Sequence, residues 1–216
     1  MAAIKEINLQ TPTGKTHNPV EEAVVDNIKM LFETTKLVGT EYVIPNGEED
    51  LAIDVVSTAH DDELIFLSTV GSGASKTKGN ISIDGNNLPY RSEFFAVAAG
   101  RDSSVVIGEV LAKLAFIVNQ KQEMFTPGMV LGGIGPVGSK LTHVFLNTSP
   151  IGFEDKEASP IVIEGEFAIL WVAATLITQD EADLINSGQE GFDKFKAFIE
   201  GLEDDAFSLD REVYSA

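Results

Sequence analysis

The most constraining feature of this sequence is an uncharged, apolar run of twelve residues near the C-terminus. The run extends from Phe167 to Thr178 and lies between Glu166 and Asp180. A membrane-spanning helix needs about 20 apolar residues, so we expect a buried strand or core segment. If the run is a strand, alternate side chains take opposite faces, and Trp171, the only tryptophan, lies on the face of residues 167, 169, 173, 175 and 177. Both faces are apolar, which predicts that helices or loops cover each of them.

Along the rest of the chain, strand-like segments lie in clusters, with helical segments between and after them. A helix over 19–35 is predicted, because Asn18 can cap it, Pro19 suits its first position and Glu21 completes a capping box. A second helix is predicted over 103–119 from its helical spacing. The side chains expected to pack these helices on a sheet are Val24, Ile28, Leu31, Leu111 and Leu114. Strands are predicted at 51–56, 63–70, 90–99, 141–147 and 166–177.

Two stretches rich in glycine, 71–87 and 128–138, are predicted as irregular loops. Residues 161–177 are predicted to form a hairpin bent at Glu164 and Gly165. Thr178 and Glu181 form a capping box that opens a short helix, and a further helix follows with its phenylalanines on one face. No linker divides the chain, so we expect residues 1–17 to form a tail or edge segment and residues 18–216 a single α+β domain.

Composition limits the possible partners. The chain has 15 basic and 34 acidic residues, a net charge of -19, and no cysteine. Its acidity disfavours binding to nucleic acid and favours a basic protein partner, although solubility alone also explains it. The first residues, MAAIKEINLQ, lack the pattern of a signal peptide, and no membrane span is expected. We therefore expect a cytoplasmic protein.

Motifs for catalysis or cofactor binding are weak. Residues 133–140, GIGPVGSK, differ from a Walker A loop because Ser139 and Lys140 are exchanged and a strand follows. No G-x-S-x-G motif occurs. His60-Asp61 resembles a metal-ligand pair but lies between two strand-like runs, where a turn is the simpler interpretation. We expect that the protein is not an enzyme, and we predict no catalytic, cofactor-binding or metal-binding residue.

The order of several segments points to a family. These are LAIDVV at 51–56, LSTVGSGAS at 67–75, SEFFAVA at 92–98, LAKLAFIVNQ at 111–120, SKLTHVFLNTSP at 139–150, FAILWVAATLITQDEADLI at 167–185 and FSLDRE at 207–212. Over roughly residues 45–212 the chain resembles the Suppressor-of-fused domain family. That resemblance implies an α+β fold with a mixed, largely antiparallel sheet and packed helices.

The resemblance also implies a ligand-binding region, at residues 125–130. Here the sequence departs from the family, because Met129 and Val130 stand where the family often has Asp or His. The aromatic residue of the family's preceding helix is absent near Ile117. We also expect no counterpart of the second domain that completes the binding cleft of the animal protein.

Single-domain bacterial members of this family are thought to be immunity proteins, which implies a non-enzymatic adaptor that neutralises a basic toxin. The acidic residues expected to make this contact are Glu48, Glu49, Asp50, Asp61, Asp62, Glu203, Asp204 and Asp205. A solvated turn remains open for each of these acidic clusters. The alternative is a carboxylate- or metal-dependent hydrolase that uses the region of His60, Asp61 and Asp62.

Overall fold

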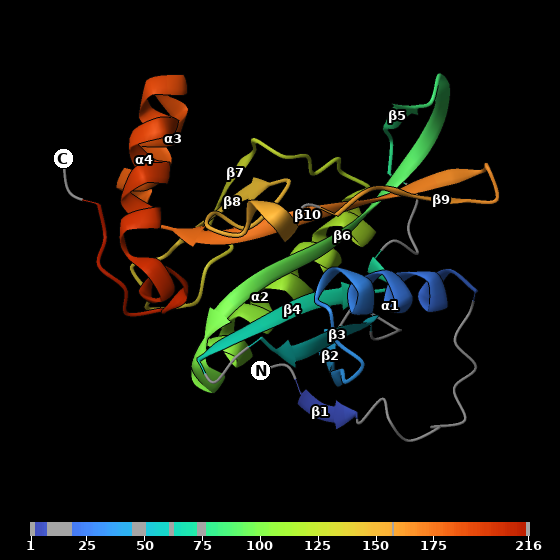
Figure 1. Cartoon of the computed structure of the whole chain (residues 1–216), viewed down its shortest axis with the longest axis horizontal. Coiled ribbons are helices and arrows are strands. Elements are labelled where there is room, and N and C mark those ends of the chain that lie inside the picture. Colours follow the sequence, from blue (N-terminus) through green and yellow to red (C-terminus); the bar gives the residue numbers. More distant parts are fainter. Residues whose placement is uncertain are drawn as a thin grey trace.

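The apolar run forms a central strand, β10 (Phe167–Ile177), of a ten-stranded sheet (Figure 1). The computed structural model describes residues 3–7, 19–44, 51–60, 63–72, 77–156 and 158–214. On one side β10 pairs in parallel with β6 (Asn86–Ala99), and on the other it pairs antiparallel with β8 (His143–Asn147) and β9 (Ile161–Ile163). The other strand pairs in the described residues are antiparallel. The predicted mixed, largely antiparallel sheet is confirmed.

The remaining strands complete the sheet on both sides of this centre. They are β1 (Ala3–Ile7), β2 (Val38–Ile44), β3 (Leu51–Ala59), β4 (Leu64–Val70), β5 (Asn80–Ile83) and β7 (Val130–Gly132). The order is β1-β2-β3-β4-β6-β10-β8-β7, with β5 added to β6 and β9 added to β10. Thus β1 and β7 are the edge strands of the main path.

The two long helices cover opposite faces of this sheet (Figure 1). Helix α1 (Pro19–Leu31) buries Val24 and Ile28 fully and Leu31 partly, and helix α2 (Gly100–Lys121) buries Leu111 and Leu114. The packing of all five predicted side chains is thereby confirmed. Their burial contributes roughly 1.5–3 kcal/mol for each fully buried side chain.

Alternation along β10 follows the prediction. Trp171 is 3% exposed, packs in the α1 cluster with Ile169 and Ala173, and meets the ring of Phe95 edge-on. Val172 lies in the α2 cluster on the opposite face. The run is apolar on both faces because both faces are covered.

The C-terminal elements form a third apolar cluster over the end of β8 and β10. They are α3 (Gln179–Asn186), α4 (Gln189–Gly201) and the 3-10 turn η3 (Glu203–Phe207), and a further turn, η2 (Glu154–Lys156), lies before β9. Phe195 and Ile199 of α4 pack with Phe145 and Ile177 in this cluster. The predicted capping box is present, with Thr178 and Glu181 exchanging hydrogen bonds.

The structure corrects both predicted loops. The stretch 71–87 contains β5 and the start of β6, which form a hairpin, and the stretch 128–138 contains β7. These strands are only four and three residues long, too short to show a period beside so many glycines. The cap at Asn18 lies outside the described residues. Residues 3–7 pair with β2 at the sheet edge.

Candidate protein-binding surface

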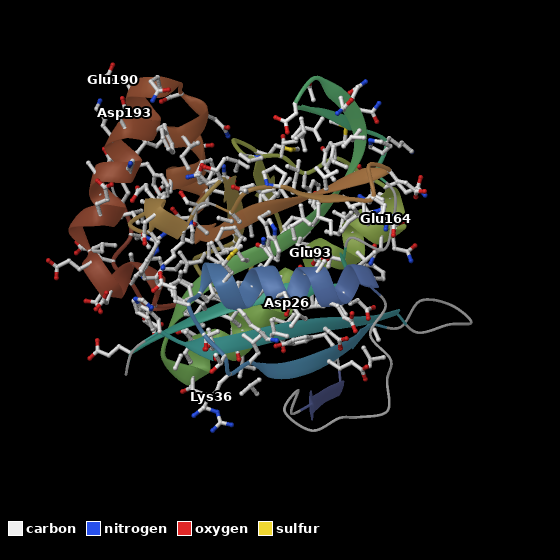
Figure 2. All side chains as sticks on the ribbon, turned by 45° about the vertical axis from the view of Figure 1, so that its right-hand side comes forward. Asp26, Lys36, Glu93, Glu164, Glu190 and Asp193 are labelled. Atoms are coloured by element: carbon white, nitrogen blue, oxygen red, sulfur yellow. The ribbon has the colours of Figure 1, made fainter. Side chains whose placement is uncertain are left out.

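One group of the family-like residues forms a buried carboxylate network rather than an open site. Glu93 of β6 is fully buried, and Figure 2 shows it in the middle of the molecule. Its carboxylate accepts hydrogen bonds from the hydroxyls of Thr69 at 2.6 Å and Ser72 at 2.8 Å, and from the backbone N–H of Gly71 at 3.0 Å. Two of the family-like segments, the LSTVGS turn and the SEFF strand, therefore hold each other in place.

A second buried carboxylate joins the C-terminal segment to α3. Arg211 donates to both oxygens of Glu181, with Nη1 at 2.8 Å and Nη2 at 2.6 Å, and both side chains are fully buried. Arg211 also donates to the carbonyl of Leu176, while the backbone N–H groups of Thr178 and Tyr214 donate to Glu181. This geometry is the bidentate fork that arginine makes with a carboxylate.

The charge of this pair is compensated internally. Burial raises the pKa of Glu181, but the hydrogen bonds and the charge of Arg211, together with the two backbone N–H groups, outweigh burial and hold that pKa below its ordinary value. Glu181 therefore remains a carboxylate bound to arginine. The pair anchors the C-terminal segment against β10 and α3, and it joins the FSLDRE segment to the capping box of α3.

The residues of the hydrolase alternative are only partly described. His60 follows β3, and its ring lies edge-on to Phe66 at 4.8 Å and to Phe153 at 5.8 Å between ring centroids. Asp61 and Asp62 lie outside the described residues. Among the residues that the structure does describe, no group of three or more His, Asp or Glu side chains is placed to hold a metal ion. His60 is thus seen here as a member of an aromatic cluster.

Of the predicted acidic contacts, three can be placed. Glu203, Asp204 and Asp205 form the exposed first part of η3, whereas Glu48, Glu49, Asp50, Asp61 and Asp62 lie outside the described residues. Glu203 and Asp204 line a hollow of about 180 Å³, whose other walls include the apolar side chains of Phe153, Ile199 and Phe207. A hollow with carboxylates at its rim and apolar walls suits a lysine or arginine side chain, which has an apolar stem and a charged end.

These acids belong to a larger charged region, which we call the C-terminal acidic surface: the exposed acids from Thr178 to Tyr214. It has ten exposed acids (Asp180, Asp183, Glu190, Asp193, Glu200, Glu203, Asp204, Asp205, Asp210 and Glu212) and two lysines, Lys194 and Lys196, for a net charge of -8. Figure 2 shows Glu190 and Asp193 at the outer end of the helices. The eleventh acid of this segment, Glu181, is buried against Arg211.

Both lysines of this surface already have acidic neighbours. Lys194 pairs with Glu190 at 2.8 Å, and Lys196 pairs with Glu154 at 3.0 Å and Glu200 at 3.5 Å. The acids of η3 are not among these partners. The predicted phenylalanine stripe holds α4 on the core, so its charged side remains exposed.

Residues 125–130, the stretch that resembles the family's ligand-binding region, lead into the edge strand β7. Phe125 is buried, while Met129 and Val130 are partly buried and pack against the apolar clusters on either face. The backbone N–H of Gly128 donates to the carbonyl of Leu146, and the N–H of Leu146 donates to the carbonyl of Met129. The apolar residues at 129 and 130 thus serve packing between β7 and β8.

Comparison with known proteins identifies the family. Residues 49–212 match the family model of the Suppressor of fused protein (SUFU), and the chain belongs to this family. The crystal structure of Drosophila Suppressor of Fused is similar over 90% of this chain and 51% of that chain, with a TM-score of 0.58 and 11% sequence identity. The chain thus spans about half the length of that protein.

A second similar structure is the Sufu-Fu complex crystal structure. It is similar over 90% of this chain and 91% of that chain, with a TM-score of 0.57 and 12% identity. At such identities the likeness establishes the fold. No curated protein matches this chain in sequence. No helix in the described part of the chain is long and apolar enough to span a membrane.

Proposed function

We propose that this chain is a non-enzymatic protein-binding domain that acts in the cytoplasm as an immunity or adaptor protein and neutralises a basic toxin. The observation that carries this proposal is the C-terminal acidic surface, with its hollow between Phe153, Phe207 and the acids of η3. Membership of the Suppressor-of-fused family supports a role in protein binding.

Electrostatic steering gives this surface a physical role. A net charge of -8 on one region attracts a positively charged partner before contact, and salt screens this attraction over about 8 Å at physiological ionic strength. Many toxin domains are nucleases with a basic, phosphate-binding cleft. An acidic surface that covers such a cleft would block its substrate.

The test uses the protein encoded by the neighbouring gene as the partner. We expect it to bind this chain with an association rate that falls at least tenfold between low and physiological salt. Reversing Glu203, Asp204 and Asp205 to Lys should slow association further. Co-expression with this chain should restore growth to cells in which the partner is toxic, and the triple variant should protect less well.

A matched control distinguishes the effect of the C-terminal acidic surface on association from the effect of total charge. Reversing three exposed acids elsewhere, Glu22, Asp26 and Glu123, changes the net charge by the same amount. If both triple variants slow association equally, the C-terminal acidic surface is not the contact. If the association rate changes neither with salt nor in either triple variant, the acidity serves solubility alone.

A further inference from the structure

Two hairpins, each with an acid followed by a glycine in its turn, project from one end of the sheet. The first joins β5 to β6 through Asp84 and Gly85, and the second joins β9 to β10 through Glu164, Gly165 and Glu166. The acid and the glycine have positive φ in both turns, at 49° and 81° in the first and at 48° and 75° in the second. In Figure 1 the two hairpins diverge as they leave the sheet.

The hairpins separate where proline removes a hydrogen-bond donor. The backbone N–H of Tyr90 donates to Gly79 on the β5 side, so the nitrogen of Pro89, one residue earlier, faces the β10 side. Proline has no N–H to give to a neighbouring strand. Parallel pairing of β6 with β10 accordingly begins at Tyr90 and Ala168. Before this point the inner edges of the two hairpins face each other without pairing.

A groove of about 490 Å³ lies between the hairpins. Its apolar lining comes from Ile83 and Leu88 of the first hairpin and Val162 of the second, and Val162 is 43% exposed. Asn86 and Asn87 add amide groups to the same lining. Apolar side chains with a few polar groups are the usual lining of a site that binds another molecule.

The charges around this groove are acidic. Asp84 lines it and Glu164 stands beside its lining residue Gly165, and both are exposed; Figure 2 shows Glu164 at the periphery of the molecule. The nearby cation, Arg91, lies over the ring of Phe167 at 3.7 Å, and the charge of Glu166 acts on it. Arg91 is therefore engaged at the base of the second hairpin, and the tips remain negative.

The turns themselves do not require these acids. The first central residue of such a turn has positive φ, a position that Asn and Gly fill best. Glutamate is poorly suited to the positive φ of position 164. Removing the two charges by Asp84→Asn and Glu164→Asn should therefore leave the hairpins folded and relieve strain.

We propose that this groove docks an extended, lysine- or arginine-bearing segment of a protein partner. The segment would lie between the diverging strands, take backbone hydrogen bonds from their inner edges, and place apolar side chains on Leu88 and Val162 and basic side chains beside Asp84 and Glu164. This inference rests on the proposed function, because it assumes the same kind of partner, a basic protein. It adds a second contact with that partner, away from the C-terminal acidic surface.

The probe is a short capped peptide of alternating lysine and valine, with a glutamate-valine peptide as its charge-reversed control. Amide chemical shifts of the whole chain are followed by NMR during titration. We expect the lysine peptide to shift residues 83–88 and 162–166, and the glutamate peptide to shift neither group. The double variant Asp84→Asn, Glu164→Asn should weaken binding of the lysine peptide about fivefold or more.

The matched control is Asp204→Asn, Asp205→Asn, which removes two charges from the C-terminal acidic surface and should leave peptide binding unchanged. Shifts confined to that surface, equal weakening by both double variants, or no shift at all would overturn the groove proposal. The proposed function would remain intact if reversal of the η3 acids slows association with the partner protein while the lysine peptide shifts no residue of the hairpins. Peptide binding at the hairpins, without any basic partner that binds the C-terminal acidic surface, would support the groove and overturn the proposed function.

Discussion

Glu93 and Glu181 are both fully buried carboxylates, and they differ in the hydrogen-bond donors that surround them. Among the partners of Glu93 are three neutral donors, the hydroxyls of Thr69 and Ser72 and the backbone N–H of Gly71. Glu181 is bound by a full positive charge on Arg211. Burying a carboxylate is costly unless such partners are present. Hydroxyl and amide donors therefore contribute to holding Glu93, whereas a bidentate arginine holds Glu181.

This difference predicts unequal costs when a partner is lost. The variant Arg211→Met leaves the carboxylate of Glu181 buried without its counter-charge. We expect it to lower the free energy of unfolding by about 3–5 kcal/mol. Chemical denaturation followed by the fluorescence of Trp171, which should shift to the red on unfolding, measures this loss.

The double variant Glu181→Leu, Arg211→Met is the matched control. It replaces the ion pair by apolar side chains of similar size, so it should recover much of the stability that Arg211→Met loses. A double variant as unstable as the single one would show that the hydrogen bonds of Arg211 and Glu181 to the backbone, rather than the pairing of their charges, hold the C-terminal segment.

The loss at Glu93 should be smaller. In Glu93→Gln an amide N–H₂ group replaces one carboxylate oxygen, and the hydroxyls of Thr69 and Ser72 can turn to accept from it, whereas the N–H of Gly71 still needs an acceptor. We expect a cost of about 1.5–3 kcal/mol, the usual range for hydrogen bonds to a charged group. Thr69→Val removes one donor and should cost less. A cost for Glu93→Gln that equals that of Arg211→Met would break the comparison.

The ion pair should also show in the pH dependence of stability. Because the folded-state pKa of Glu181 lies below its unfolded value, near 4.3, the pair stabilises the protein fully above that value and less as pH falls through the folded pKa. The stability difference between wild type and Arg211→Met should thus be largest at neutral pH and shrink on acidification. It shrinks first because the unpaired, buried Glu181 of the variant takes up a proton, and then, below about pH 4, because the wild type loses its ion pair. Urea titrations at several pH values measure it, and a difference that grows on acidification would contradict the assignment.

Local patterns predicted most of the fold. The two long helices and five strands follow from the periodic spacing of apolar residues, and the alternation in β10 identified the faces that meet α1 and α2. Periodicity cannot show which distant strands pair. The parallel pairing of β6 with β10 joins segments more than 70 residues apart in sequence, and β5 and β7 were too short to detect.

The candidate sites were harder to predict. The capping box assigned Glu181 to Thr178 correctly, but its second partner lies 30 residues away, and no local pattern marks Arg211. The turn at Glu164 and Gly165 was predicted, whereas its counterpart at Asp84 and Gly85 was included in a loop. The groove between them depends on tertiary structure, because it arises where Pro89 ends the pairing of two strands.

The smallest effect is expected where acids are exposed. Glu203, Asp204 and Asp205 lie on the surface, and Glu203 has a positive φ of 51°, which asparagine tolerates better. The variant Glu203→Asn, Asp204→Asn, Asp205→Asn should keep its free energy of unfolding within about 0.5 kcal/mol of wild type, as surface substitutions usually do. We expect the free energy of unfolding to rise slightly, because the variant relieves both the repulsion with Glu200 and the backbone strain at residue 203. Thermal unfolding at low salt, where repulsion is strongest, gives the clearest measurement. A loss above about 1 kcal/mol would mean that these acids help to hold η3 on the core, and that the contrast between buried, structural carboxylates and exposed, partner-binding ones does not hold for this surface.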